Sequence, residues 1–187
     1  MRPQKVDDKA LMEGLMAVLR AKGYDGASLN ELASACGLQK ASLYHRFPGG
    51  KKDIALAVLA FVGQWTEEHI FRVLRDETYP CGERLFLALK NTDIVYHSGE
   101  ASCLLRALSM DSGLELFGQT LKESMEKWIE AFQKLGQDWG LDESAARNLG
   151  MQVLIKIQGS LVVSKTLGDT TPFQNALGEI EAMYQAL

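Results

Sequence analysis

The chain has 187 residues, of which 47% are hydrophobic and 24% are charged, and its net charge at pH 7 is −4. These values are ordinary for a globular protein and argue against a disordered or fibrous chain. No apolar stretch approaches the roughly 20 residues that cross a bilayer, and residues 1–8 lack the apolar core of a signal peptide. We therefore expect a cytoplasmic protein with no membrane partner.

Three helices are expected at the start of the chain. The first spans residues 8–22 and ends at Gly23. The second begins at the capping box Ser28-Leu29-Asn30-Glu31, in which the serine and glutamate satisfy each other's free backbone donors. It stops at Gly37, because glycine readily adopts the left-handed conformation that closes a helix. The third spans residues 39–47 and is closed by Pro48.

Longer helical patterns fill the rest of the chain and predict an all-α fold. We expect helices over residues 51–77, 83–97, 104–110, 113–137, 142–167 and 173–187. Apolar residues at helical spacing predict that the fourth of these is buried along its whole length: Leu114, Phe117, Leu121, Met125, Trp128, Phe132 and Leu135.

The second and third helices form the pattern of a helix-turn-helix, since two short helices meet at a tight turn that contains a glycine. Leu32, Leu38, Leu43 and Phe47 are expected to face a common core, with the small Ala33 where the helices cross. The remaining side chains of the third helix are short or rich in hydrogen-bond donors: Lys40, Ala41, Ser42, Tyr44, His45 and Arg46. Such side chains reach base edges and phosphates from the major groove of DNA.

The distribution of charge agrees with that interpretation. Residues 1–56 carry nine Lys and Arg against six acids, whereas the rest of the chain carries eleven against eighteen. A basic head on an acidic body suits a head that meets phosphates. The competing interpretation is an ordinary helical hairpin with a solvated face, and the detailed sequence decides against it.

The stretch from Leu29 to Asp53, LNELASACGLQKASLYHRFPGGKKD, resembles the DNA-binding signature of the TetR family of transcription regulators nearly position by position. Two shorter stretches resemble the LmrA/YxaF-type subgroup: Phe47-Pro48-Gly49-Gly50-Lys51 and Asp169-Thr170-Thr171-Pro172-Phe173. The resemblance implies a three-helix DNA-binding domain over residues 1–50. It also implies a helical ligand-binding and dimerisation domain over residues 51–187.

The resemblance also implies roles for single residues. Ser28, Tyr44 and Lys51 match positions that contact phosphates in the family. Gln39, Lys40, Ala41 and Ser42 match positions that face the bases. The family often has histidine where this chain has Arg46, and His45 lies one position earlier. Either side chain can donate to a phosphate, so which of the two contacts DNA stays open.

The last two helices are expected to form a homodimer. The helix over residues 142–167 is apolar on more than one face, and Gly150, Gly159, Ser160 and Ser164 permit close helix approach. The resemblance implies that these two helices make a four-helix interface with their copies. Two recognition helices about 34 Å apart would then read a palindromic operator in double-stranded DNA.

The middle helices are expected to enclose a small-molecule site, because apolar side chains with a few polar groups are typical of ligand pockets. Core packing is the competing role for each of these residues. The candidates are Phe61, Trp65, Phe86, Leu89, Leu105, Met110, Phe117, Leu121, Met125, Trp128 and Gln158. Family members usually bind an inducer in such a site.

The sequence therefore predicts a repressor that binds DNA as a dimer and is released by a small hydrophobic inducer of unknown identity. One alternative is a regulator that senses oxidation through Cys81 or Cys103. Another is a helical ligand-binding protein with an idle DNA-binding head. No catalytic motif, cofactor site or metal-ligand spacing is present in the sequence, so neither an enzyme nor a metalloprotein is expected.

Overall fold

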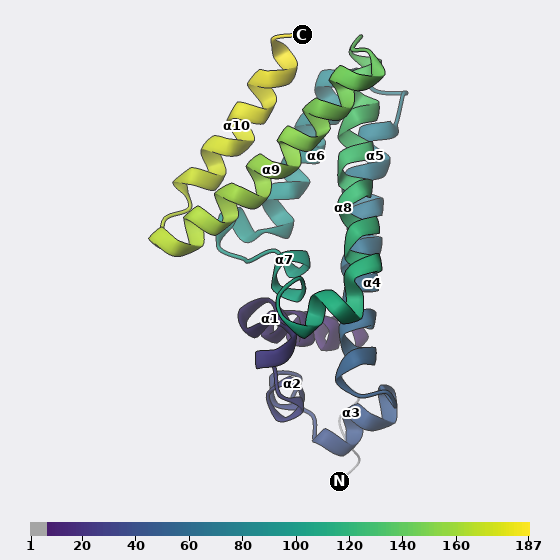
Figure 1. Ribbon diagram of the computed structural model, residues 1–187, viewed down its shortest axis with the longest axis vertical. Coiled ribbons are helices and arrows are strands. Elements are labelled where there is room, and N and C mark those ends of the chain that lie inside the picture. Colours follow the sequence, from purple (N-terminus) through teal and green to yellow (C-terminus); the bar gives the residue numbers. More distant parts are fainter. Residues whose placement is uncertain (1–6) are drawn as a thin grey trace. The chain divides into compact units, whose positions relative to one another are not determined.

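The computed structural model describes residues 7–187, and these residues form helices and no strands (Figure 1). The all-α prediction is confirmed. In chain order the helices are α1 (Asp8–Gly26), α2 (Leu29–Ala35), α3 (Lys40–Arg46), α4 (Lys51–Thr66), the π-helix η1 (Glu67–Phe71), α5 (Arg72–Arg75), α6 (Cys81–Val95), the 3₁₀-helix η2 (His97–Gly99), α7 (Leu104–Leu108), α8 (Ser112–Asp138), α9 (Glu143–Leu167) and α10 (Thr171–Gln185). None of these helices is long and apolar enough to span a membrane.

The described chain divides into two compact units. The first comprises the chain up to Gly63 together with Leu104–Leu121, and the second comprises Gln64–Cys103 and Lys122–Leu187. These packing units differ from the functional division expected at residues 50 and 51, because α7 packs on α1 and so belongs with the head. The division into residues 1–50 and 51–187 concerns function and stays a prediction.

The core of the first unit joins the head helices. α1 contributes Leu11, Leu15 and Leu19, and α2 and α3 contribute Leu32 and Leu43; all five are buried. α1 is kinked at Gly23, which has a φ of 68°, so the regular helix stops where the sequence predicts. Burial of these leucines against α1 stabilises the seven-residue helices α2 and α3, which would be marginal alone.

The second unit contains a wide turn inside a long helical segment. The sequence predicts one helix over residues 51–77, but Glu67–Phe71 forms a π-helical turn between α4 and α5. The side-chain amide of Asn91 in α6 donates to the carbonyl of His69 at 2.7 Å, and the Trp65 and His69 rings stack at 4.4 Å. A tertiary contact therefore satisfies a carbonyl within the turn, which is how π-turns are tolerated in helices.

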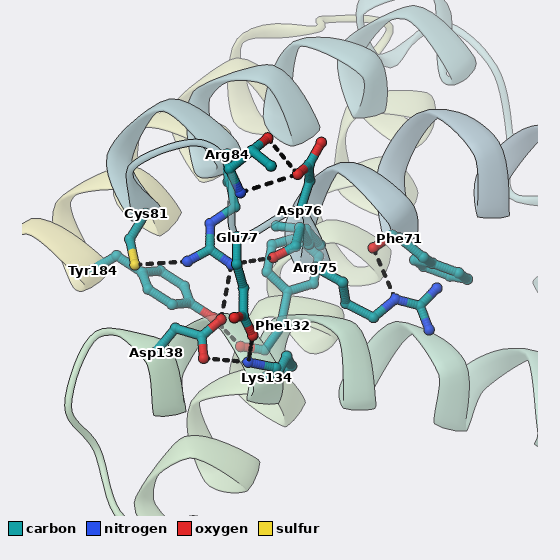
Figure 2. Close-up of polar contacts among 12 residues, drawn as sticks. Phe71, Arg75, Asp76, Glu77, Cys81, Arg84, Phe132, Lys134, Asp138 and Tyr184 are labelled. Atoms are coloured by element: carbon teal, nitrogen blue, oxygen red, sulfur yellow. Dashed lines mark hydrogen bonds and ion pairs between the residues drawn. The ribbon is translucent and has the colours of Figure 1, made fainter.

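The same unit contains a partly buried polar cluster around Arg84 (Figure 2). Arg84 is only 4% exposed; its guanidinium donates to the carbonyl of Leu74 at 3.0 Å and to the carboxylate of Asp138 at 2.8 Å. Lys134 pairs with Asp138 and with Glu77. The cluster thus ties the end of α5 and the start of α6 to the end of α8.

Two of the expected buried positions are corrected by the structure. Leu114 lies in the first turn of α8 and is exposed, although Phe117, Leu121, Trp128, Phe132 and Leu135 of the same stripe are buried. Met125 is half-buried. Periodicity identifies the apolar face of a helix but not how far its neighbours extend along that face, so the predicted burial along the whole stripe is wrong at its start.

Candidate nucleic-acid interface

The N-terminus of α2 is fixed by the capping box that the sequence predicts. The Ser28 hydroxyl accepts from the backbone N–H of Glu31 at 3.3 Å, and the Ser28 N–H donates to the Glu31 carboxylate at 3.0 Å. Hydrogen bonds from Lys22 and then from Ser28 lower the pKa of Glu31 to about 2. The Ser28 side chain is therefore held at an exposed helix end, where free backbone N–H groups favour an anion.

The turn between α2 and α3 is built as predicted. Gly37 has a φ of 63°, the left-handed conformation expected after the end of α2. The N–H of Leu38 then donates to the carbonyl of Ala33 at 2.9 Å. Gly14 of α1 packs so closely on α2 that a Cβ there would lie 2.9 Å from the carbonyl oxygen of Ala35. The sequence prediction did not assign Gly14 a role, although a glycine inside a helical pattern signals such an approach.

α3 presents a donor-rich face to solvent. Leu43 is buried, whereas Gln39 and the expected contact residues of α3 are all exposed: Lys40, Ala41, Ser42, Tyr44, His45 and Arg46. The Arg46 guanidinium donates to the Asp8 carboxylate at 2.9 Å, and this pair links α3 to α1. An exposed helix face with short residues at its start is the geometry that fits a major groove.

Lys51 begins α4 and is half-buried. Gly50 before it has a φ of 68°, and the N–H of Gly49 donates to the Asp53 carboxylate at 2.6 Å. The Lys51 ammonium lies 4.4 Å from the centre of the Tyr24 ring. This contact joins positions far apart in the sequence, which is why the sequence alone did not reveal Tyr24.

The expected ligand-binding residues fall into three groups by exposure. Leu89, Leu105, Phe117, Leu121 and Trp128 are buried, and Phe61, Trp65, Met125 and Gln158 are half-buried. Phe86 and Met110 are 56% and 55% exposed, so they do not lie with the others. Phe86 is one position past the buried Leu85 and faces outward, and Met110 follows the end of α7.

The structure brings some of these residues into aromatic contacts. Trp128 packs edge-on against Phe71 at 5.3 Å, and Phe117 packs edge-on against Tyr24 at 5.1 Å. Gln158 differs from the rest: both polar atoms of its amide are buried and have no hydrogen-bond partner among the described residues. A buried amide without a partner is unfavourable, so this position has unused capacity for a polar group.

The cysteines occupy different environments. Cys36 and Cys103 are buried, and burial raises the pKa of the Cys36 thiol. Cys81 is half-buried at the start of α6, and its sulfur accepts from the Arg84 guanidinium at 3.0 Å (Figure 2). Cys81 is therefore part of the polar cluster of the second unit.

Comparison with known proteins identifies both halves of the chain. Residues 11–58 match the family model of bacterial regulatory proteins of the TetR family. Residues 85–179 match the model for the C-terminal domain of LmrA/YxaF-like transcriptional regulators. The first match covers the helix-turn-helix.

Similar sequences and solved structures agree with these two family matches. The uncharacterised HTH-type regulator YxaF of Bacillus subtilis is 26% identical, with 83% of each chain covered. The HTH-type regulator LmrA of the same organism is 23% identical, with 87% of this chain and 88% of LmrA covered. A TetR regulator from Legionella pneumophila superposes with a TM-score of 0.80 at 19% identity, covering 98% and 99% of the two chains.

A cysteine mutant of the TetR-family regulator CifR was solved in complex with 26-bp double-strand operator DNA. It superposes with a TM-score of 0.73 at 24% identity, and 99% of each chain is covered. Similarity at this level shows a common fold. With both family models matched, the chain belongs to the TetR family of transcriptional regulators, as a DNA-binding helix-turn-helix protein with an LmrA/YxaF-like C-terminal domain.

Proposed function

We propose that the protein is a repressor that binds a palindromic operator as a homodimer and is released by a small, mainly apolar inducer. In this proposal residues 1–50 bind DNA, and residues 51–187 bind the inducer and dimerise. The observation that carries the proposal is the exposed, donor-rich face of α3 on a helix-turn-helix fixed by the Ser28 capping box. That face has the chemistry that reads base edges in a major groove.

The contact residues divide by their expected partners. Gln39, Lys40, Ala41 and Ser42 face the bases, and Ser28, Tyr44 and Lys51 bind phosphates. Because the Arg46 guanidinium is held by Asp8, His45 is the better placed of the two neighbouring candidates for a phosphate. The DNA-bound form of CifR supports a role of this kind for the shared fold.

The exposed apolar residues of α9 support dimerisation through α9 and α10. Met151, Ile155, Val162, Val163 and Leu167 are all exposed on α9, next to its buried face. α9 also packs along α10 within the second unit. Several exposed apolar residues on one helix are typical of a protein–protein interface, and a second copy is the partner that palindromic DNA requires.

The inducer site is proposed within the helical body. Within the second unit, the buried Leu89 and Trp128 supply apolar lining, and the unpaired Gln158 amide supplies a donor and an acceptor for a polar group of the inducer. A ligand response is favoured over oxidation sensing at Cys103, since that cysteine is buried. Cys81 is half-buried beside Arg84, and the peroxide assay below tests it.

The decisive experiment is selection of DNA from a random pool by the purified protein at about 50 mM salt, where phosphate contacts are strong. We expect an enriched palindrome. Lys40→Ala should change the preferred bases. Lys51→Ala should weaken binding to all sequences alike and reduce the slope of log affinity against log salt by about 1 for each head.

The alternatives give different results in the same assay. An idle head would enrich no sequence, even after mass spectrometry of the denatured sample shows that no inducer was co-purified. A thiol-based regulator would lose its palindrome on peroxide treatment, and Cys81→Ser or Cys103→Ser would abolish that response. Either result would overturn the proposed inducer mechanism.

A further inference from the structure

Tyr24 lies between Lys51, a candidate contact to DNA, and the start of α8. On one side, the Lys51 ammonium lies 4.4 Å from the centre of its ring. On the other, Phe117 of α8 packs against it edge-on, with ring centres 5.1 Å apart and planes at 78°. All three residues belong to the first compact unit. The ring therefore contacts both side chains at once.

The Tyr24 ring is held in place by its surroundings. Gly23 has a φ of 68° and approaches α7 so closely that a Cβ there would lie 3.0 Å from the carbonyl oxygen of Ala107. The backbone N–H of Ser112 donates to the Asp25 carboxylate at 3.1 Å, and the Ser112 hydroxyl donates to the other oxygen at 2.5 Å. Residues on both sides of Tyr24 are thus tied to α7 and to the start of α8.

Lys51, in contrast, lies at a position of its helix that is electrostatically unfavourable for a lysine. It is the first residue of α4, and the partial positive charge of a helix N-terminus disfavours a cation there. A free lysine side chain also loses much rotamer freedom when it is fixed on a ligand. The electron-rich face of an aromatic ring offsets both effects, because it attracts the ammonium and orders it before DNA arrives.

We propose that Tyr24 is a positioning residue that holds the Lys51 ammonium ready for a DNA phosphate. This inference rests on the proposed function, in which Lys51 is a phosphate contact. An ammonium over a ring keeps N–H groups free to donate, so the ring contact and the phosphate contact are compatible. Because Phe117 contacts the Tyr24 ring and Ser112 holds the neighbouring Asp25, the start of α8 sets the position of this charge.

The test changes the ring electrostatics and leaves its shape nearly constant. Phenylalanine and its mono-, di- and trifluorinated analogues are placed at position 24 of the full chain, and affinity for the selected operator is measured. Fluorine withdraws charge from the ring face and weakens a cation–π contact. We expect Tyr24→Phe to bind as the wild type does. Affinity should then fall steadily with fluorination, to about three to five times weaker per head in the last analogue.

A second series in the Lys51→Met background separates positioning from packing. There the affinity should be lower throughout and independent of fluorination. The role of Tyr24 would be overturned if affinity fell equally with fluorination in the wild-type and Lys51→Met proteins, or if it fell in neither. Either result would leave DNA binding itself intact. Failure of every variant and of the wild type to bind DNA would instead remove the proposed function, and this inference with it.

The contact is also measurable without DNA. In the free protein, the ring current of Tyr24 should shift the ε-methylene protons of Lys51 upfield in the NMR spectrum. The shift should remain in Tyr24→Phe and disappear in Tyr24→Leu, with circular dichroism confirming that this variant is folded. An unshifted Lys51 in the wild type would also overturn the proposal.

Discussion

At the scale of single residues, Arg84 and Asp138 form the least exposed ion pair among the described residues. Burial alone would raise the pKa of Asp138, but hydrogen bonds from Lys134 and Arg84 outweigh it and hold that pKa below its usual value. The Asp138 carboxylate is therefore more acidic in the folded than in the unfolded chain. The carboxylate stabilises the fold at any pH above the pKa that Asp138 has in the unfolded chain. This contribution is lost as the pH falls through the lower pKa that Asp138 has in the folded chain.

Asp138→Asn should lower the free energy of unfolding by about 2–4 kcal/mol, because it leaves the Arg84 charge buried without its counter-charge. Denaturant unfolding at pH 7 measures this loss. The variant should also lose part of the decline in stability that the wild type shows below about pH 4. Glu13→Gln, in an exposed pair with Lys9, is the control and should change little. Equal losses of stability in the two variants would contradict the expectation that the Arg84–Asp138 pair stabilises the fold more than the exposed Lys9–Glu13 pair.

At the scale of elements, local signals predicted the head better than the body. Ser28, Glu31 and Gly37 act on neighbouring backbone, so the sequence located α2 and its end correctly. The wide turn Glu67–Phe71 was not predictable in this way. Its residues carry an ordinary helical pattern, and the hydrogen bond to the His69 carbonyl comes from Asn91 in another helix.

The same distinction applies to the candidate interface. The contact residues of α3 are contiguous and could be predicted from a single motif. The contact between Tyr24 and Lys51 depends on how α1 and α4 pack and has no local signal. Phe86 shows the reverse error: its place in an apolar segment predicts a lining residue, but its side chain is exposed on α6.

The capping box yields a prediction for α2. Ser28→Ala should destabilise the protein by about 1 kcal/mol, because the N–H of Glu31 loses its acceptor. Ser28→Asn keeps a capping oxygen and should stay within a few tenths of a kcal/mol of the wild type. Thermal unfolding compares the three proteins. Similar melting of Ser28→Ala and wild type would mean that the cap contributes nothing to the stability of the head.

The same cap has a pH dependence. The pKa of Glu31 is lowered to about 2 in the fold, so its stabilising effect is present above the ordinary glutamate pKa. It is lost as the pH falls toward 2. In Ser28→Ala this loss should be smaller, since one of the hydrogen bonds that lower the pKa is absent.

At the scale of the whole molecule, the exposed surface of α9 is the main feature that one chain leaves unexplained. Ile155 on that surface is 61% exposed. Leu114 of α8, at 56%, is a similarly exposed apolar residue outside α9 and α10. The two positions therefore make a matched pair for testing where the copies meet.

Ile155→Glu should convert the proposed dimer to a monomer and lower operator affinity by roughly a hundredfold or more, since it would add a buried carboxylate on each side of the proposed interface. Leu114→Glu should leave the mass unchanged. Analytical ultracentrifugation gives the mass, and circular dichroism checks the fold. A dimeric Ile155→Glu protein would place the interface elsewhere.

The wide turn Glu67–Phe71 takes up one more residue than a regular helical turn. A residue added to a regular helix would rotate everything after it by about 100°, but the wider turn absorbs that rotation, so α5 keeps nearly the phase of an uninterrupted helix. Deleting one residue there should therefore leave the Leu74 carbonyl facing Arg84, whereas the His69 carbonyl would be withdrawn from Asn91. The turn thus confines the effect of its additional residue to the contact with α6, and the polar cluster beyond it tolerates a chain that is one residue shorter.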